Sequence, residues 1–145
     1  MKAIIQRVNH AQVEVEKKII NKISKGYLIY ICFEKDDSRE KLLKLSQKIA
    51  KLRIFEDQRG KMNQDISEVA GDILSISQFT LSWDGKKGNR PSFDRSMLPE
   101  DAKSFYDLFN TELRNYGLNV FEGIFGADMK ILSENDGPVT FSFDF

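Results

Sequence analysis

The stretch Tyr27-Leu28-Ile29-Tyr30-Ile31-Cys32-Phe33 is the longest apolar run of the chain, and Gly26 directly precedes it. A continuous apolar run of this length, bounded by a glycine, is typical of a central strand that is buried on both faces. The run is too short to span a bilayer. We therefore place the core of the fold around this segment.

The residues before this run predict further strands. Ala3–Val8 is mostly apolar, and within 11–15 apolar residues alternate with polar ones. An alternation with a period of two is typical of a strand with one buried face. Ile19 and Ile20 indicate another short strand. His10 lies between the first two segments, where we expect a turn.

The residues after this run predict two helices. Asp37 and Glu40 fit a capping box at the start of the first helix, with Ser38 as the alternative cap. The second helix is expected to begin near Pro99 and to stop at Gly117. The apolar stripes of these helices are Leu42, Leu45, Ile49 and Leu52 in the first, and Ala102, Phe105, Phe109, Leu113 and Tyr116 in the second.

The end of the chain contains the clearest strand. Val139, Phe141, Phe143 and Phe145 alternate with polar residues, and Asp72–Ser77 has the pattern of a further buried strand. Strands therefore outnumber helices, and the two helices are far apart in the sequence. This order predicts an α+β fold in which residues 1–145 form a single domain, with a mostly antiparallel sheet or partial β-barrel and two main helices.

The composition is that of a globular domain and excludes several classes of function. The chain has 145 residues, of which 41% are hydrophobic and 30% charged. Its formal net charge is zero, which excludes a bulk polycation that coats nucleic acid. One cysteine and one histidine exclude an intrachain disulfide and a Cys/His zinc site, and any Ser-His-Asp triad would have to use His10. The start of the chain lacks the apolar core of a signal peptide, so we expect a cytoplasmic protein.

One candidate for chemistry is Ser77-Gln78-Phe79-Thr80-Leu81, which follows a predicted strand. Two hydroxyls, a carboxamide and several backbone N–H donors at a strand end are the components of an oxyanion site. No nearby histidine would activate Ser77 or Thr80 as a nucleophile. The same residues could instead only cap a turn.

The loop 84–93 is a second candidate, because it combines glycines with three cations. Lys86, Lys87 and Arg90 could contact a phosphate backbone, although the loop lacks the Gly-Lys-Ser/Thr ending of nucleotide hydrolases. Residues 99–145 carry nine acidic and three basic side chains, so residues 1–98 have a net charge of +6. A polyanion would thus meet the first part of the chain more favourably. A solvated loop is the alternative interpretation.

Seven segments, taken in their order and spacing, resemble the D-aminoacyl-tRNA deacylase family, also called D-tyrosyl-tRNA deacylases. The resemblance extends over the whole chain. The segments are Ala3–Val8, Leu52–Asp57, Gly60–Asn63, Ser77–Leu81, Lys87–Phe93, Phe125–Met129 and Asn135–Thr140.

The resemblance implies a cytoplasmic homodimer that hydrolyses the ester joining a D-amino acid to the 3′ end of tRNA, without a metal, a cofactor or a membrane. X-Pro bonds are mostly trans in proteins, but the resemblance implies a cis Gly137-Pro138 bond that enters the active site of the partner subunit. There it would reject L-aminoacyl groups sterically, and glycyl-tRNA would be accepted because glycine has no side chain to reject. This is chiral proofreading in translation.

The resemblance also implies roles for individual residues. Ser77, Gln78, Phe79 and Thr80 would contact the ester and its oxyanion, and the terminal 2′-OH of the tRNA would assist the reaction. An alternative mechanism makes Thr80 or Ser77 a nucleophile, and an alternative function is a non-catalytic nucleic-acid-binding module on the same fold. The implied substrate-binding residues are Phe125 and Met129 for adenosine, Arg7 as a support for the Gly-Pro segment, and Lys86, Lys87 and Arg90 for the acceptor stem.

Overall fold

Strand β3 (Gly26–Cys32) is the central strand of the computed structural model, which describes residues 1–86 and 88–145. It lies between β1 (Lys2–Val15) and β6 (Asp72–Ser77). Side chains along β3 alternate between two apolar clusters, so that Tyr27 and Ile29 pack in one and Leu28 packs in the other. Burial on both faces explains why this strand is apolar throughout.

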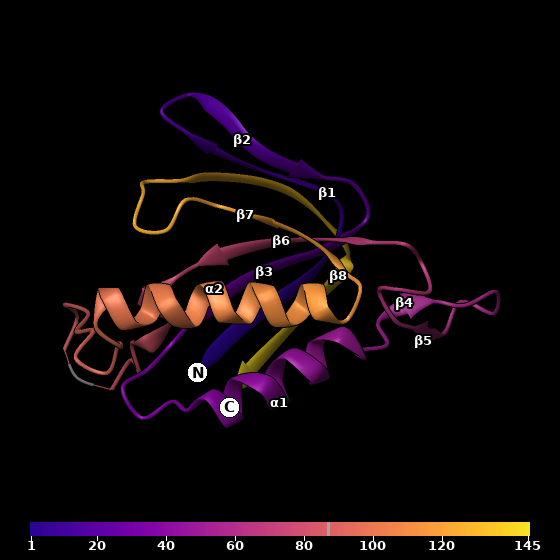
Figure 1. Cartoon of the computed structure of the whole chain (residues 1–145). Coiled ribbons are helices and arrows are strands. Elements are labelled where there is room, and N and C mark those ends of the chain that lie inside the picture. Colours follow the sequence, from indigo (N-terminus) through magenta and orange to yellow (C-terminus); the bar gives the residue numbers. More distant parts are fainter. Residues whose placement is uncertain (87) are drawn as a thin grey trace.

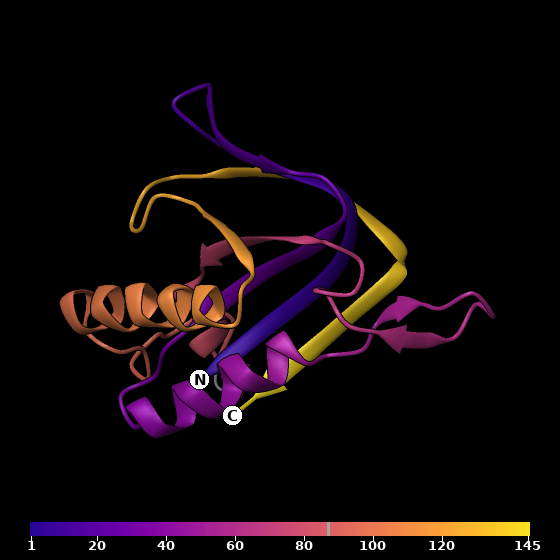
Figure 2. The ribbon, with the colours of Figure 1, turned by 45° about the vertical axis from the view of Figure 1, so that its right-hand side comes forward.

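The sheet is mixed and curves until it is nearly a barrel (Figures 1 and 2). Its order is β2 (Lys18–Ile23), β1, β3, β6 and β7 (Asn119–Glu122), and β8 (Lys130–Asp144) pairs with β1. The pairings of β1 with β2, β3 and β8 are antiparallel, whereas β3–β6 and β6–β7 are parallel. The predicted fold class is confirmed, with the difference that two pairings are parallel because a helix connects each of these strand pairs.

Both helices cover the same side of the sheet (Figure 1). Helix α1 (Arg39–Ala50) is capped by Ser38, whose Oγ accepts a hydrogen bond from the Lys41 N–H at 3.3 Å. Asp37 instead accepts from the Glu34 N–H at 2.7 Å, so the alternative cap is the correct one. Helix α2 (Pro99–Asn115) begins where expected. Tyr116 follows its last residue and is exposed, so its assignment to the apolar stripe was wrong.

The remaining elements are short. Strands β4 (Phe55–Glu56) and β5 (Met62–Gln64) form a separate hairpin, and a 3₁₀ turn, η1 (Phe79–Ser82), follows β6. His10 lies inside the continuous strand β1 and not in a turn, because β1 pairs with β8 on both sides of it. Among the described residues, no helix is long and apolar enough to cross a membrane.

The contact between β3 and β6 requires a glycine at their shared start. A Cβ atom at Gly26 would lie 1.8 Å from the carbonyl oxygen of Asp72. The two strands can therefore pair from Gly26 onward only without a side chain at this position. This close pairing aligns the ends of β3 and β6.

Candidate active site

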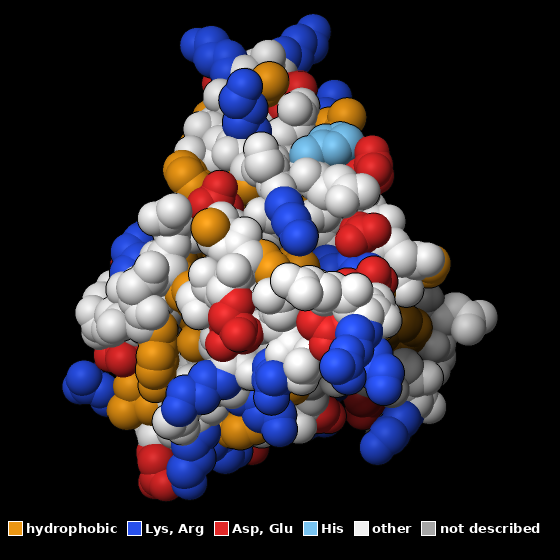
Figure 3. Space-filling model, turned by 90° about the vertical axis from the view of Figure 1, so that its right-hand side faces the viewer, with side chains coloured by type: hydrophobic (Ala, Val, Ile, Leu, Met, Phe, Trp, Pro, Cys, Tyr) orange, Lys and Arg blue, Asp and Glu red, His pale blue; other side chains and the backbone are white. Residues whose placement is uncertain are grey.

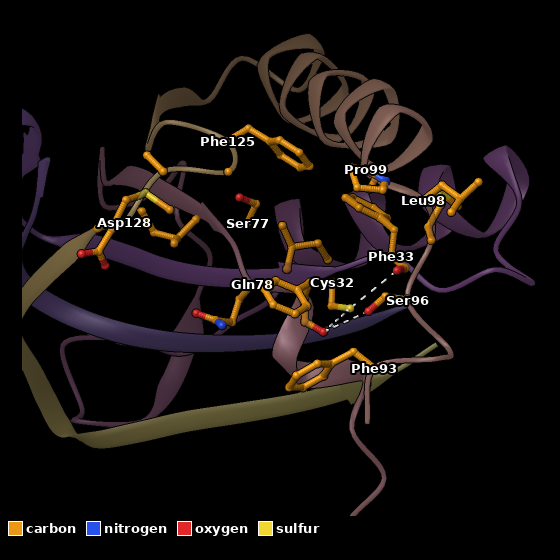
Figure 4. Close-up of a pocket in the computed structure, with 18 of the residues that line it drawn as sticks. Cys32, Phe33, Ser77, Gln78, Phe93, Ser96, Leu98, Pro99, Phe125 and Asp128 are labelled. Carbon is orange, nitrogen blue, oxygen red and sulfur yellow. Dashed lines mark hydrogen bonds between the residues drawn. The ribbon is translucent and has the colours of Figure 1, made fainter. Parts of the chain in front are cut away.

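A cleft opens where β3 and β6 end, with a cavity volume of about 720 Å³ (Figure 4). The carboxyl ends of parallel strands meet at one edge of a sheet, which is where α/β proteins place ligands. Its walls come from four regions far apart in the sequence. They are the end of β3, the end of β6 with η1, the loop before α2 together with the start of α2, and the β7–β8 connection. Among the lining residues are Cys32, Ser77, Gln78, Phe79, Phe93, Ser96, Phe125, Asp128 and Met129.

Aromatic rings form two walls of the cleft. The rings of Phe79 and Phe93 pack edge to face with centroids 4.9 Å apart. Phe125 packs against Tyr106, whose hydroxyl donates to the Ser75 carbonyl at 2.7 Å. Burial raises the pKa of Tyr106 to about 12, so this hydroxyl remains a donor at neutral pH. The cleft can therefore accept a flat apolar group between fixed rings.

The turn after β6 carries backbone donors that have no partner among the described residues. The N–H of Gln78 is used, because it donates to the Ile31 carbonyl at 2.8 Å. Within residues 1–86 and 88–145, the N–H groups of Phe79 and Thr80 donate to no backbone or side-chain acceptor. The Gln78 side chain donates to Thr80 Oγ1 at 2.5 Å. Two neighbouring free N–H groups beside a cleft are suited to hold an oxyanion.

An activated nucleophile is not seen in the described part of the cleft. His10 is exposed, does not line it, and has its Nδ1 3.6 Å from Glu134 Oε2. The only histidine is visible at the surface in Figure 3. Burial raises the pKa of the Cys32 thiol to about 11, which disfavours the reactive thiolate. Among the described residues, no group of three or more His, Cys, Asp or Glu side chains could hold a metal ion.

Residues 136–139, here called the projection, leave the sheet at the middle of β8. Gln6 of β1 pairs with Thr140 of β8, and Val8 pairs with Asn135. Residues 136–139 therefore lie between two paired positions that are only two residues apart on β1. The projection thus lies inside β8. The Gly137-Pro138 peptide bond is cis, and Gly137 has φ +122°, which an L side chain rarely adopts.

The buried Arg7 and the half-buried Asn135 and Asp136 hold the projection. Arg7 is 4% exposed; its Nη1 donates to the Ile54 carbonyl at 2.7 Å, and its Nε lies 2.9 Å from Asp136 Oδ2. Asn135 bridges the projection, because its Oδ1 accepts from the Val139 N–H at 2.9 Å and its Nδ2 donates to Thr140 Oγ1 at 3.1 Å. The side chain of Arg7 is thus held from two sides, next to Gly137.

The basic loop is exposed. Lys86 and Arg90 are solvent-exposed and do not line the cleft, and Lys87 lies outside the described residues. Lys and Arg side chains also occur at the top and along the lower part of the face in Figure 3, so positive charge is not confined to this loop.

The structure brings together only part of the predicted site. Ser77, Gln78, Phe79, Phe125 and Met129 line the cleft, and Thr80 is adjacent through its bond to Gln78. Arg7, Gly137 and Pro138 lie together at the projection and do not line the cleft of the same chain. Sequence reasoning missed the lining residues Cys32, Ser96 and Leu98 as site residues; the position of Cys32 at a strand end was the one available signal.

Comparisons with known proteins give consistent results. A family model described as D-Tyr-tRNA(Tyr) deacylase matches residues 4–144. The D-aminoacyl-tRNA deacylase of Lactobacillus acidophilus is 49% identical over 99% of both chains, and that of Thermosipho africanus is 46% identical over 99% of this chain and 97% of its own. The solved structure of the c-Myc DNA Unwinding Element Binding Protein is 37% identical, with a TM-score of 0.94 over 100% of this chain and 99% of its own. A probable eukaryotic D-amino acid tRNA deacylase shares the fold at 20% identity, with a TM-score of 0.84 over 99% of this chain and 98% of its own.

Proposed function

Because this chain belongs to the D-Tyr-tRNA(Tyr) deacylase family, a family of hydrolases, we propose that it hydrolyses the ester of D-aminoacyl-tRNA. Water adds to the ester carbonyl carbon, and the tetrahedral oxyanion then collapses as the bond to the 3′ oxygen breaks. The 3′ oxygen takes up a proton. The products are free tRNA and the D-amino acid.

The observation that carries this proposal is the pair of N–H groups at Phe79 and Thr80, which lie beside the cleft and have no acceptor within residues 1–86 and 88–145. Fixed backbone donors stabilise a developing oxyanion without having to reorganise during the reaction. The cleft volume is within the range of small-molecule sites and suits an aminoacyl-adenosine. In this scheme Phe125 and Met129 contact the adenosine, and Ser77 and Gln78 contact the ester.

The absence of a histidine beside Thr80 in the described cleft favours assistance by the 2′-OH of the terminal adenosine. The Thr80 hydroxyl accepts from the Gln78 amide, which is not a base and cannot remove its proton. We therefore expect Thr80→Ala to keep substantial activity. Complete loss in a folded Thr80→Ala protein, together with trapping by an acyl reagent, would favour a covalent mechanism.

Chiral selection is assigned to the projection of a partner subunit in a homodimer. Gly137 and Pro138 stand out from the sheet and do not line the cleft of their own chain. In a symmetric dimer, each projection could enter the cleft of the other chain. A rigid backbone wedge there would reject L side chains and accept glycyl-tRNA, with Arg7 as its support.

The basic loop is assigned to the acceptor stem. Lys86 and Arg90 are exposed on the chain segment that follows η1, and Lys87 is between them in sequence. Contacts of lysine and arginine with phosphates position a nucleic acid without reading its sequence. The enzyme would act in the cytoplasm, where tRNA is charged and used.

A nucleic-acid-binding module without hydrolysis is the second candidate. The observation favouring it is the similarity to the c-Myc DNA Unwinding Element Binding Protein, which is named for binding such an element. The net charge of +6 over residues 1–98 is compatible with either candidate.

The deciding experiment measures hydrolysis of D-tyrosyl-tRNA, L-tyrosyl-tRNA and glycyl-tRNA by the purified protein. We expect cleavage of the D and glycyl esters and sparing of the L ester. Cleavage of both enantiomers would overturn the assigned wedge. Salt-sensitive binding to tRNA or DNA without any cleavage would support the binding module instead.

A further inference from the structure

The carbonyl oxygen of Phe79 accepts hydrogen bonds from two side chains that line the cleft. The donors are Cys32 Sγ at 3.5 Å, which also lies 3.6 Å from the Phe33 carbonyl oxygen, and Ser96 Oγ at 3.3 Å. The hydroxyl of the buried Ser82 lies 2.7 Å from Ser96 Oγ and extends this network. Groups from the end of β3 and from the loop before α2 thus converge on one backbone atom of η1 (Figure 4).

Holding this carbonyl also sets the direction of a neighbouring donor. The Phe79 carbonyl and the Thr80 N–H belong to one planar trans peptide, so they point in opposite directions. Cys32 and Ser96 lie on one side of the carbonyl oxygen, and Gln78 lies on the other (Figure 4). The Thr80 N–H, which has no acceptor in the described part of the chain, is therefore held toward the Gln78 side.

We propose that Cys32 and Ser96 are positioning residues for the hydrolysis, because together they hold the Phe79–Thr80 peptide so that its N–H faces the developing oxyanion. This inference rests on the proposed function. It assigns a role to a thiol that is otherwise inert and to a serine that sequence analysis left unassigned.

The chemistry of both donors suits this role. Burial, with a smaller effect from Glu34, raises the pKa of the Cys32 thiol to about 11, so the thiol keeps its proton at neutral pH. Ser96 is held in place by the backbone on both sides of it. The Lys35 N–H donates to the Arg95 carbonyl, and the Met97 N–H donates to the Phe33 carbonyl, both at 3.0 Å.

The test compares variants that remove a donor with variants that keep it. Cys32→Ala and Ser96→Ala should each lower kcat on D-tyrosyl-tRNA about 2- to 10-fold, the range for losing one hydrogen bond. The double variant should lose more. Cys32→Ser and Ser96→Thr retain a donor and should restore most of kcat. Affinity for a non-hydrolysable amide analogue of D-tyrosyl-adenosine should change less than twofold, because the donors act on the oxyanion.

Ser46→Ala is the matched control. Ser46 is buried in α1, and its hydroxyl donates to the Leu42 carbonyl at 3.0 Å, far along the chain from η1. The control removes a hydrogen bond of the same type, and its kcat should equal that of the wild type. The ¹³C chemical shift of the Phe79 carbonyl should move in the two alanine variants at Cys32 and Ser96, and not in Ser46→Ala.

Three results would overturn the proposal. Folded alanine variants with wild-type kcat would show that the network does not position the donor, and an unmoved Phe79 ¹³C shift would show that the hydrogen bonds are not made. Equal losses of kcat in Cys32→Ala and Cys32→Ser would indicate that the Cys32 side chain acts through packing and not through its hydrogen bond. If the wild type cleaves no aminoacyl-tRNA, the proposed function fails, and the positioning role fails with it even where the carbonyl shift confirms the hydrogen bonds.

Discussion

The cleft and the projection are built in opposite ways. The cleft is concave, lies at the ends of β3 and β6, and has apolar walls from four separate chain segments. The projection is exposed at Gly137 and Pro138, lies outside the β1–β8 pairing, and depends on a few polar side chains such as Arg7 and Asn135. Under the proposed function the first binds and activates the ester, and the second selects its chirality.

This difference indicates how each region should respond to substitution. Substituting one residue in a wall of many apolar contacts removes only part of the binding energy, because the neighbouring side chains still contact the ligand. A loop held by only two or three polar contacts loses its position when one of them is removed, and the loss is largest where the contact is buried, as it is for Arg7. The projection should therefore be the more sensitive of the two regions.

The largest expected effect is that of Gly137→Ala on selectivity. Gly137 has φ +122°, and a Cβ atom there would lie 2.7 Å from Val139 Cγ2 and 3.1 Å from Val139 N. The projection must shift, and a displacement of about 1 Å at a reacting centre can change rates about 100-fold. We expect the ratio of D- to L-tyrosyl-tRNA cleavage to fall by about that factor in single-turnover assays.

Gly117→Ala is the control for this prediction. Gly117 also has a positive φ, +79°, but a Cβ atom there meets nothing within 4 Å. It should cost some stability and leave the D-to-L ratio unchanged. A folded Gly137→Ala protein with the wild-type ratio would contradict a selective role for the projection.

The second effect is the stability lost in Arg7→Ala. Removing this buried guanidinium leaves the Ile54 carbonyl and the Asp136 carboxylate without their partner. We expect the free energy of unfolding to fall by about 2–4 kcal/mol, measured by urea denaturation. Arg114→Ala removes a comparable carbonyl and carboxylate pairing from an exposed position, and should cost less than about 1 kcal/mol. Equal losses of unfolding free energy in Arg7→Ala and Arg114→Ala would contradict the prediction that the buried pairing stabilises the protein more than the exposed one.

The third effect concerns the cleft wall. Phe125→Ala removes a ring that packs on Tyr106 and lines the cleft. We expect binding of the amide analogue of D-tyrosyl-adenosine to weaken about 10-fold by calorimetry, with the D-to-L ratio unchanged. Phe121→Ala, on β7 and outside the cleft lining, should leave affinity at the wild-type level. A changed D-to-L ratio in Phe125→Ala would contradict the assignment of binding to the cleft and of chiral selection to the projection.

The smallest expected effect is a pH dependence of stability from Cys32. The thiol has its ordinary pKa of 9.0 in the unfolded chain, whereas burial raises its pKa to about 11 in the folded one. The unfolded state therefore loses a proton first, and stability falls as the pH rises from 9 to 11. Over this range the wild type should lose about 1–2 kcal/mol more than Cys32→Ser in urea denaturation. If stability falls equally with pH in the wild type and in Cys32→Ser, the pKa of the thiol is not raised in the folded protein.

The elements with strong local patterns could be predicted from the sequence. The apolar run around Ile29 became the central strand, and the alternation at Val139–Phe145 became the end of β8. The start of α2 at Pro99 was also predicted. Errors occurred where two local solutions compete, as at Asp37 and Ser38. Both side chains can cap a helix. The Asp37 carboxylate instead accepts a hydrogen bond from the Glu34 N–H, and Ser38 caps the helix.

The candidate site was predictable only along single segments. Ser77–Thr80 could be singled out because polar groups follow a buried strand, and the structure places Ser77, Gln78 and Phe79 at the cleft. The contributions of Cys32 and Ser96 could not be predicted. They depend on hydrogen bonds to the Phe79 carbonyl across 47 and 17 residues of sequence.

The sequence by itself determined the strands, the two helices and the resemblance to a family, because periodicity, caps and motifs are encoded within a few neighbouring residues. Only the tertiary structure decided that β3 and β6 run parallel, which gathers the cleft walls at one edge of the sheet. It also decided that residues 136–139 lie outside the pairing of β1 with β8. Register and strand direction depend on contacts between distant segments, and these contacts form only when the whole chain packs.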